Sequence, residues 1–163
     1  MSFSMPMVGL GTWLISNDEV SKIVTDALNL GYRHIDTAQV YRNEEGIGKA
    51  LVASSLLRED IFITTKMWPG MFGQEEPFQN FKGAMSACDD SLTFLQVDEI
   101  DLYLIHNPFA KENRLEQWEA MIELKKQGKD VQVVFAGPEK QPLYSYAMRQ
   151  RVSELGLDNA VIW

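Results

Sequence analysis

The chain has 163 residues, of which 45% are hydrophobic and 23% are charged, and its net charge is −8 at pH 7. An acidic chain of this kind is disfavoured as a binder of nucleic acid or of anionic membranes. Its length suffices for one domain with a substantial core, but it falls short of the roughly 250 residues of a complete eight-stranded α/β barrel.

Apolar patterning predicts strands and helices in strict alternation along the chain. The predicted strands are 7–13, 34–38, 61–66, 99–105, 131–136 and 159–163. The predicted helices are 19–30, 45–54, 78–95, 114–127 and 144–155, with Asn17 or Asp18 as the N-cap of the first. Because such alternation is typical of parallel sheets with crossover helices, we expect an α/β fold. It would be a partial TIM-barrel-like array of about six parallel strands with outer helices.

The cellular setting is suggested by what the sequence lacks. Cys88 is the single cysteine, so no internal disulfide can form, as is usual in a reducing cytoplasm. It falls in an apolar helical stripe and is expected in the core. The first residues lack the basic and apolar regions of a signal peptide, and no apolar run reaches the roughly 18 residues of a membrane helix. We therefore expect a soluble cytoplasmic protein without membrane contact.

Four polar residues follow or end predicted strands: Asp36, Tyr41, Lys66 and His106. Each has an ordinary explanation when taken singly, as a turn aspartate, a packing tyrosine, a solvated lysine or a structural histidine. Their shared place at the carboxyl ends of successive strands, where α/β barrels hold their active sites, favours a common site.

These side chains suit the reduction of a carbonyl group, which needs a hydride on carbon and a proton on oxygen. A phenol, with an ordinary pKa of about 10, is a poor acid near neutrality. A neighbouring lysine cation would stabilise the phenolate and ease proton donation, while a carboxylate holds the lysine and an imidazole orients the carbonyl. No metal is expected in such a site.

The run from residue 31 to 48 reads G-Y-R-H-I-D-T-A-Q-V-Y-R-N-E-E-G-I-G and resembles the signature of the aldo-keto reductases. Further matches lie at 8–13, 64–68 and 97–106, and the resemblance covers about residues 5–129. It implies NADPH- or NADH-dependent reduction of a small aldehyde or ketone by Asp36, Tyr41, Lys66 and His106. It also implies a cofactor site and a substrate pocket. The cofactor-binding residues would be Gly11, Thr12, Trp13 and Asp36, and the substrate-binding residues Trp13, Tyr41, Trp68 and His106. Packing at the barrel rim is the alternative for both tryptophans.

The resemblance ends near Lys129. The segments that would hold the cofactor's carboxamide and adenosine phosphate are missing from the sequence, so much of that binding site is absent. Residues 130–163 instead resemble a βαβ unit of the nucleotide-binding domain of GT-B glycosyltransferases, with a generic βαβ unit as the alternative. We therefore expect a half barrel at 1–129 and a segment at 130–163 that completes or extends the sheet.

Three functions remain open at this point. The first is an aldo-keto reductase with an incomplete cofactor site. The second is an inactive, truncated or chimeric remnant that acts only in association, since open sheet edges favour self-association. The third is binding of a sugar nucleotide by the C-terminal segment.

Overall fold

The computed structural model describes residues 5–70, 78–107, 113–127, 133–134, 150, 153 and 161–162. Its strands are β1 (Leu10–Gly11), β2 (His34–Asp36), β3 (Phe62–Met67), β4 (Leu102–Ile105), β5 (Val133–Val134) and β6 (Val161–Ile162). Its α-helices are α1 (Asn17–Asn29), α2 (Glu44–Ala53), α3 (Phe81–Leu95) and α4 (Arg114–Lys126). Two 3₁₀ turns, η1 (Gln39–Tyr41) and η2 (Arg58–Asp60), lie before α2 and β3. Most of the helix predicted at 144–155 lies outside the described residues.

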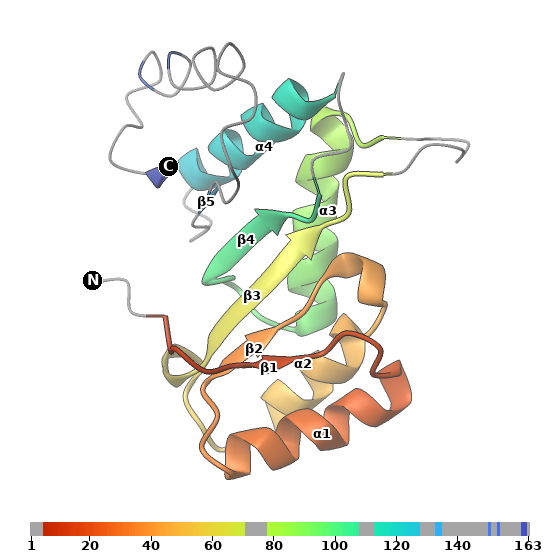
Figure 1. The fold of residues 1–163 in the computed structure, drawn as a ribbon, viewed down its shortest axis with the longest axis vertical. Helices are drawn as coiled ribbons and strands as arrows, with labels where there is room; N and C mark the ends of the chain where they lie inside the picture. The colour runs from red at the N-terminus through yellow and green to blue at the C-terminus, as the bar shows by residue number, and fades with distance from the viewer. Residues whose placement is uncertain are drawn as a thin grey trace.

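The first four strands form one parallel sheet in the order β1-β2-β3-β4 (Figure 1). Along the chain, a helix connects each of these strands to the next one. The predicted α/β fold with a partial barrel is thus confirmed. The strands do not make one array, however, because β5 and β6 pair in parallel as a separate two-stranded sheet.

Several element boundaries differ from those predicted. The first strand shrinks to Leu10–Gly11, and Met7 and Val8 before it are exposed. Helix α1 begins at Asn17 with Ser16 as its N-cap, so the predicted cap was wrong. Asn17 Oδ1 instead accepts a hydrogen bond of 2.8 Å from Gly46 N, because α2 packs close enough to use it.

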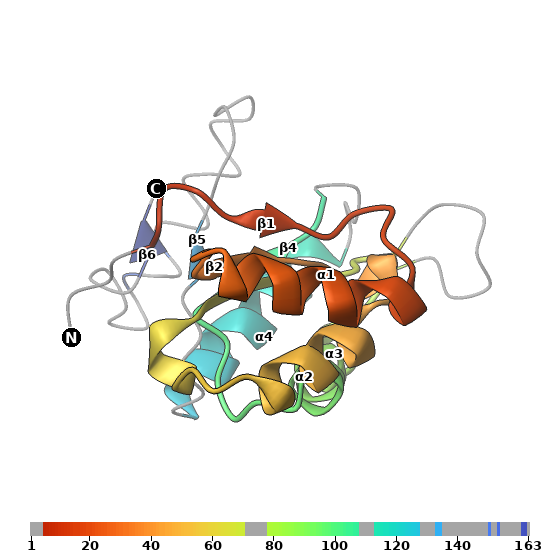
Figure 2. The same ribbon diagram turned by 90° about the horizontal axis from the view of Figure 1, so that it is seen from below.

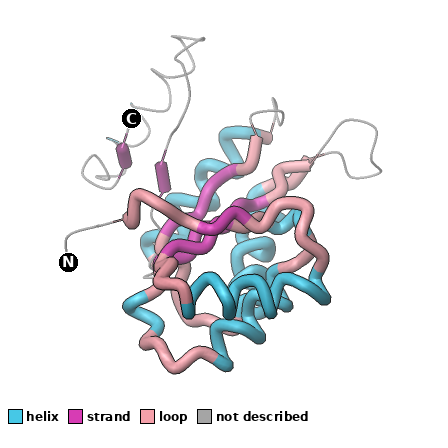
Figure 3. Tube along the Cα trace, turned by 60° about the horizontal axis from the view of Figure 1, so that its bottom comes forward, coloured by secondary structure: helices cyan, strands magenta, loops and turns pink. Residues whose placement is uncertain are grey.

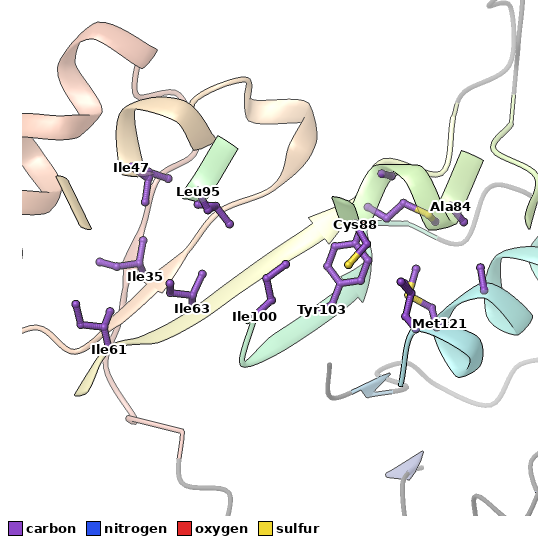
Figure 4. Close-up of a cluster of buried hydrophobic side chains, with 14 of the residues drawn as sticks. Ile35, Ile47, Ile61, Ile63, Ala84, Cys88, Leu95, Ile100, Tyr103 and Met121 are labelled. Atoms are coloured by element: carbon purple, nitrogen blue, oxygen red, sulfur yellow. The ribbon is translucent and has the colours of Figure 1, made fainter. Parts of the chain in front are cut away.

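The four helices lie on one face of the four-stranded sheet (Figures 2 and 3). Between the layers lies a continuous apolar core (Figure 4), in which Ile35 and Ile63 of the sheet face Ile47 and Leu95 of the helices. Cys88 is fully buried there, so its predicted core position is confirmed. None of the helices in the described part of the chain is long and apolar enough to cross a membrane.

Two glycines let α2 approach its neighbouring helices. A Cβ added to Gly46 would collide with Asn17 O, and one added to Gly48 would collide with Phe94 O. The helix backbones therefore nearly touch, and the start of α2 is fixed beside the carboxyl end of the sheet.

Candidate active site

The Asp36–Lys66 ion pair joins the ends of two neighbouring strands. Asp36 is the last residue of β2 and pairs with Thr64 of β3, so Lys66, two residues further on, has its side chain on the same side of the sheet. Lys66 Nζ donates 2.7 Å hydrogen bonds to Asp36 Oδ1 and to Thr37 O. The lysine side chain is 15% exposed and the aspartate side chain 37%, so the pair lies at the edge of solvent.

Tyr41 and His106 complete a cluster around Lys66. The η1 turn carries Tyr41 over the pair, with its ring centroid 5.4 Å from Lys66 Nζ. His106 follows β4, and its backbone N donates to Met67 O at 3.0 Å. The imidazole meets the Tyr41 ring edge-on, with 5.6 Å between centroids. The structure thus brings all four predicted residues together, and Asp36, Tyr41, Lys66 and His106 are called the tetrad below.

Burial and charge set the protonation states of the aromatic members. Burial, and secondly the charge of Asp36, raises the pKa of Tyr41 above its ordinary value. Burial lowers the pKa of His106, Lys66 lowers it further, and Asp36 acts against both. Tyr41 is therefore protonated and His106 neutral at pH 7. The expected stabilisation of the Tyr41 phenolate by Lys66 stays a prediction.

The residues predicted beside a cofactor differ in their exposure. Thr12 is fully buried, and its N and Oγ1 donate to Asp36 O at 3.0 and 3.3 Å. Trp13 is 68% exposed, and a Cβ on Gly11 would meet nothing within 4 Å. Gly11 and Trp13 thus offer open surface, while Thr12 supports Asp36 from inside. Trp13 thus has little packing against the described residues.

Trp68 lies next to the tetrad, against His106. Its ring meets His106 edge-on at 5.6 Å between centroids, and its backbone N donates to Gln39 Oε1 at 3.0 Å. His106 Nδ1 is buried and makes no hydrogen bond with the described residues. The imidazole therefore keeps hydrogen-bonding capacity that the described protein does not use.

Sequence reasoning missed the buried polar residues beneath the tetrad. Asn43 and Glu44 were taken only as the start of a helix, yet they are 0% and 3% exposed. Glu44 accepts hydrogen bonds from Thr65 Oγ1 at 2.6 Å and from Ser91 Oγ at 3.3 Å, and burial raises its pKa. The sequence signal for these buried residues was a pair of polar residues directly after the predicted strand and loop. A helix that begins in solvent has the same polar pair, so the sequence did not distinguish the two.

Metal ligation has no support in the described ranges: no three His, Cys, Asp or Glu side chains there are grouped so that they could hold an ion.

The comparisons with protein families, curated proteins and solved structures agree with one another. Residues 7–134 match the model of the aldo/keto reductase family. The chain is 49% identical over 125 residues to the methylglyoxal reductase DkgA of Escherichia coli (strain K12), a match that covers 76% of this chain and 42% of that protein. A solved aldo/keto reductase from Brucella melitensis is 40% identical with a TM-score of 0.73, covering 93% of this chain and 55% of the other.

A Bombyx mori aldo-keto reductase solved in complex with NADP is 34% identical with a TM-score of 0.66, covering 80% of this chain and 47% of that one. The chain thus spans about half the length of the relatives that it matches.

Proposed function

Because the chain belongs to the aldo/keto reductase family, we propose that it reduces a small aldehyde or ketone with a nicotinamide cofactor. The observation that carries this proposal is the convergence of the tetrad at the carboxyl ends of β2, β3 and β4. Four residues that serve one proton transfer meet there although 70 positions separate Asp36 from His106 (106 − 36 = 70).

Each tetrad residue has a role in the proposed reaction. Bound NADPH or NADH would supply the hydride for the carbonyl carbon. Tyr41 gives its proton to the carbonyl oxygen, which yields the alcohol, and the phenolate formed beside Lys66 regains a proton from solvent. Neutral His106 orients the carbonyl through its N–H, and Asp36 holds Lys66 in place.

Only the part of the proposed cofactor site at the end of β1 has support from the structure. Gly11 and Trp13 offer open surface next to Asp36, and these residues would hold the nicotinamide, which would supply the hydride. Residues 130–163 do not resemble the segments expected to hold the carboxamide and the adenosine phosphate. Weak binding of NADPH or NADH by the sequence given is therefore part of the proposal.

The substrate proposal draws on a relative's name. The E. coli relative is a methylglyoxal reductase, so methylglyoxal is the first carbonyl compound to assay. Its carbonyl would lie between Tyr41 and His106, and Trp13 and Trp68 would flank it.

The test combines cofactor titration with turnover. NADPH added to the purified chain should quench tryptophan fluorescence, and NADPH oxidation should depend on methylglyoxal. If turnover is measured, Tyr41→Phe should lower kcat by about 10²–10⁴-fold, because the general acid is lost. Tyr32→Phe is the matched control, since Tyr32 is part-exposed and precedes β2. A Tyr41→Phe protein with wild-type turnover would remove Tyr41 from the mechanism.

A second candidate is an association module without catalysis. Exposed apolar residues gather along β1 and the turn after it: Met7, Val8, Trp13 and Leu14. Within the described residues β1 pairs only with β2, so its other edge can pair with a second copy. Sedimentation at micromolar concentration should then show oligomers that Val8→Lys reduces. A monomer with tight NADPH binding and turnover would exclude this candidate.

The division near residue 129 and the glycosyltransferase-like character of 130–163 remain proposals, supported by the sequence pattern alone. A rise in melting temperature with UDP-glucose or ADP-glucose, but not with NADPH, would support them. A cytoplasmic location is also a proposal, supported by the single buried cysteine.

A further inference from the structure

The side-chain amide of Asn43 is fully buried and makes three hydrogen bonds. Its Nδ2 donates to Thr12 O and to Ile15 O, each at 2.9 Å. Its Oδ1 accepts from Thr37 Oγ1 at 3.0 Å. Both amide protons are thus used, and no other neutral side chain of this size supplies two donors and an acceptor in that arrangement.

Two of these bonds clamp a strained turn. Thr12 and Ile15 are the ends of a four-residue turn closed by a 3.2 Å bond from Ile15 N to Thr12 O. Leu14 inside it has φ 63°, in the left-handed region that leucine seldom adopts. Leu14 is 83% exposed, so side-chain packing does not hold it in this conformation. The Asn43 amide donates hydrogen bonds to the carbonyls on both sides of Leu14, and these bonds can hold Leu14 in the left-handed conformation.

The third bond leads to Lys66. Thr37, whose hydroxyl Asn43 accepts, presents its backbone carbonyl to Lys66 Nζ at 2.7 Å. The turn held by Asn43 contributes Thr12 N and Oγ1 as donors to the Asp36 carbonyl. Both acceptors of Lys66 are therefore connected to one amide by one or two hydrogen bonds.

We propose that Asn43 is a positioning residue for the tetrad: its amide holds the turn after β1 and the end of β2 together, and so fixes Asp36 and Thr37 where they bind Lys66. This inference rests on the proposed reductase function for its meaning in catalysis. Its structural part, the placement of Lys66, can be tested without turnover.

The test uses imidazole signals in NMR, because the chain has only two histidines. Burial, and secondly Lys66, holds the pKa of His106 below its ordinary value, so this pKa reports how closely the cluster is held. In Asn43→Ala, Lys66 loses its fixed partner at Thr37, and the pKa of His106 should move up toward 6.5. His106→Gln assigns the signals. If the wild type turns over, kcat should fall by about 10-fold or more with little change in KM.

Asn17→Ala is the matched control. Asn17 also hydrogen-bonds to α2, through Oδ1 to Gly46 N at 2.8 Å, but its bond does not touch Thr37 or Asp36. It should leave the titration of His106 and any turnover unchanged. A folded Asn43→Ala protein whose His106 titrates as in the wild type, or an equal shift in Asn17→Ala, would overturn the proposal.

One milder variant and one variant of equal volume complete the test. Thr37→Val removes only the hydroxyl bond to Asn43 and keeps the carbonyl that Lys66 uses, so it should shift His106 in the same direction by less. Asn43→Asp keeps the volume but places an acceptor against two carbonyls, so its shift should be at least that of Thr37→Val. Unchanged titration in both variants would also refute the inference. A shift of His106 without wild-type turnover would support the positioning role and count against the reductase.

Discussion

Asp36→Asn isolates the charge of the tetrad carboxylate, because asparagine keeps nearly the same shape and can still accept a hydrogen bond from Lys66. The variant leaves a lysine that is 15% exposed beside a neutral partner. We expect a loss of stability and two changes of pKa. The pKa of His106 should fall further, since Asp36 raises it, and the pKa of Tyr41 should fall toward 10, since Asp36 raises that too.

The magnitude follows from the pair's geometry. At the observed 2.7 Å, two unit charges attract by about 1.5 kcal/mol in water and by about 6 kcal/mol at an effective dielectric of 20. Solvent at the 37% exposed Asp36 and the cost of desolvating both groups cancel much of this. Since the hydrogen bond itself survives, we expect a net loss of about 1–2 kcal/mol. With an m value of about 2 kcal/mol/M, the urea midpoint should fall by about 0.5–1 M.

The control is Asp26→Asn. Asp26 pairs with Lys22 at 2.5 Å, but the two side chains are 54% and 81% exposed, so its loss should cost at most about 0.5 kcal/mol. Urea unfolding at low protein concentration and a histidine NMR titration give the measurements. Equal midpoints for the two variants, together with an unmoved His106, would show that the Asp36–Lys66 pair neither stabilises the fold nor tunes the site.

Two further predictions concern the packing and charge beneath the site. Gly48→Ala should destabilise the chain by at least about 1–3 kcal/mol in urea unfolding, because its Cβ would strike Phe94 O; Gly11→Ala, with open space around it, should be nearly neutral. The raised pKa of Glu44 means that its stabilising contribution is complete below about pH 4.5 and is lost as pH rises through the folded pKa. Glu44→Gln should therefore gain stability relative to the wild type as the pH rises above about 4.5, and a difference that does not change with pH would contradict this.

The positions of the tetrad could be predicted from the sequence because parallel βα repeats leave little choice. Once 34–38 and 61–66 are recognised as neighbouring parallel strands, Asp36 and Lys66 must reach the same edge of the sheet. His106 follows in the same way from β4. Element ends were less predictable, as β1 and the N-cap of α1 show, since backbone contacts between segments decide them.

The sequence by itself thus determined the family, the parallel α/β architecture and the residues that could form the site, since these follow from local periodicity and motif order. The tertiary structure alone decided how those residues are charged and held. Burial, and secondly Asp36, raises the pKa of Tyr41, and Asn43 and Glu44 are buried although both occur in a polar run. Desolvation and hydrogen bonding depend on which distant segments meet: Asn43 acquires its role from Thr12 and Ile15, which lie 31 and 28 positions earlier in the chain.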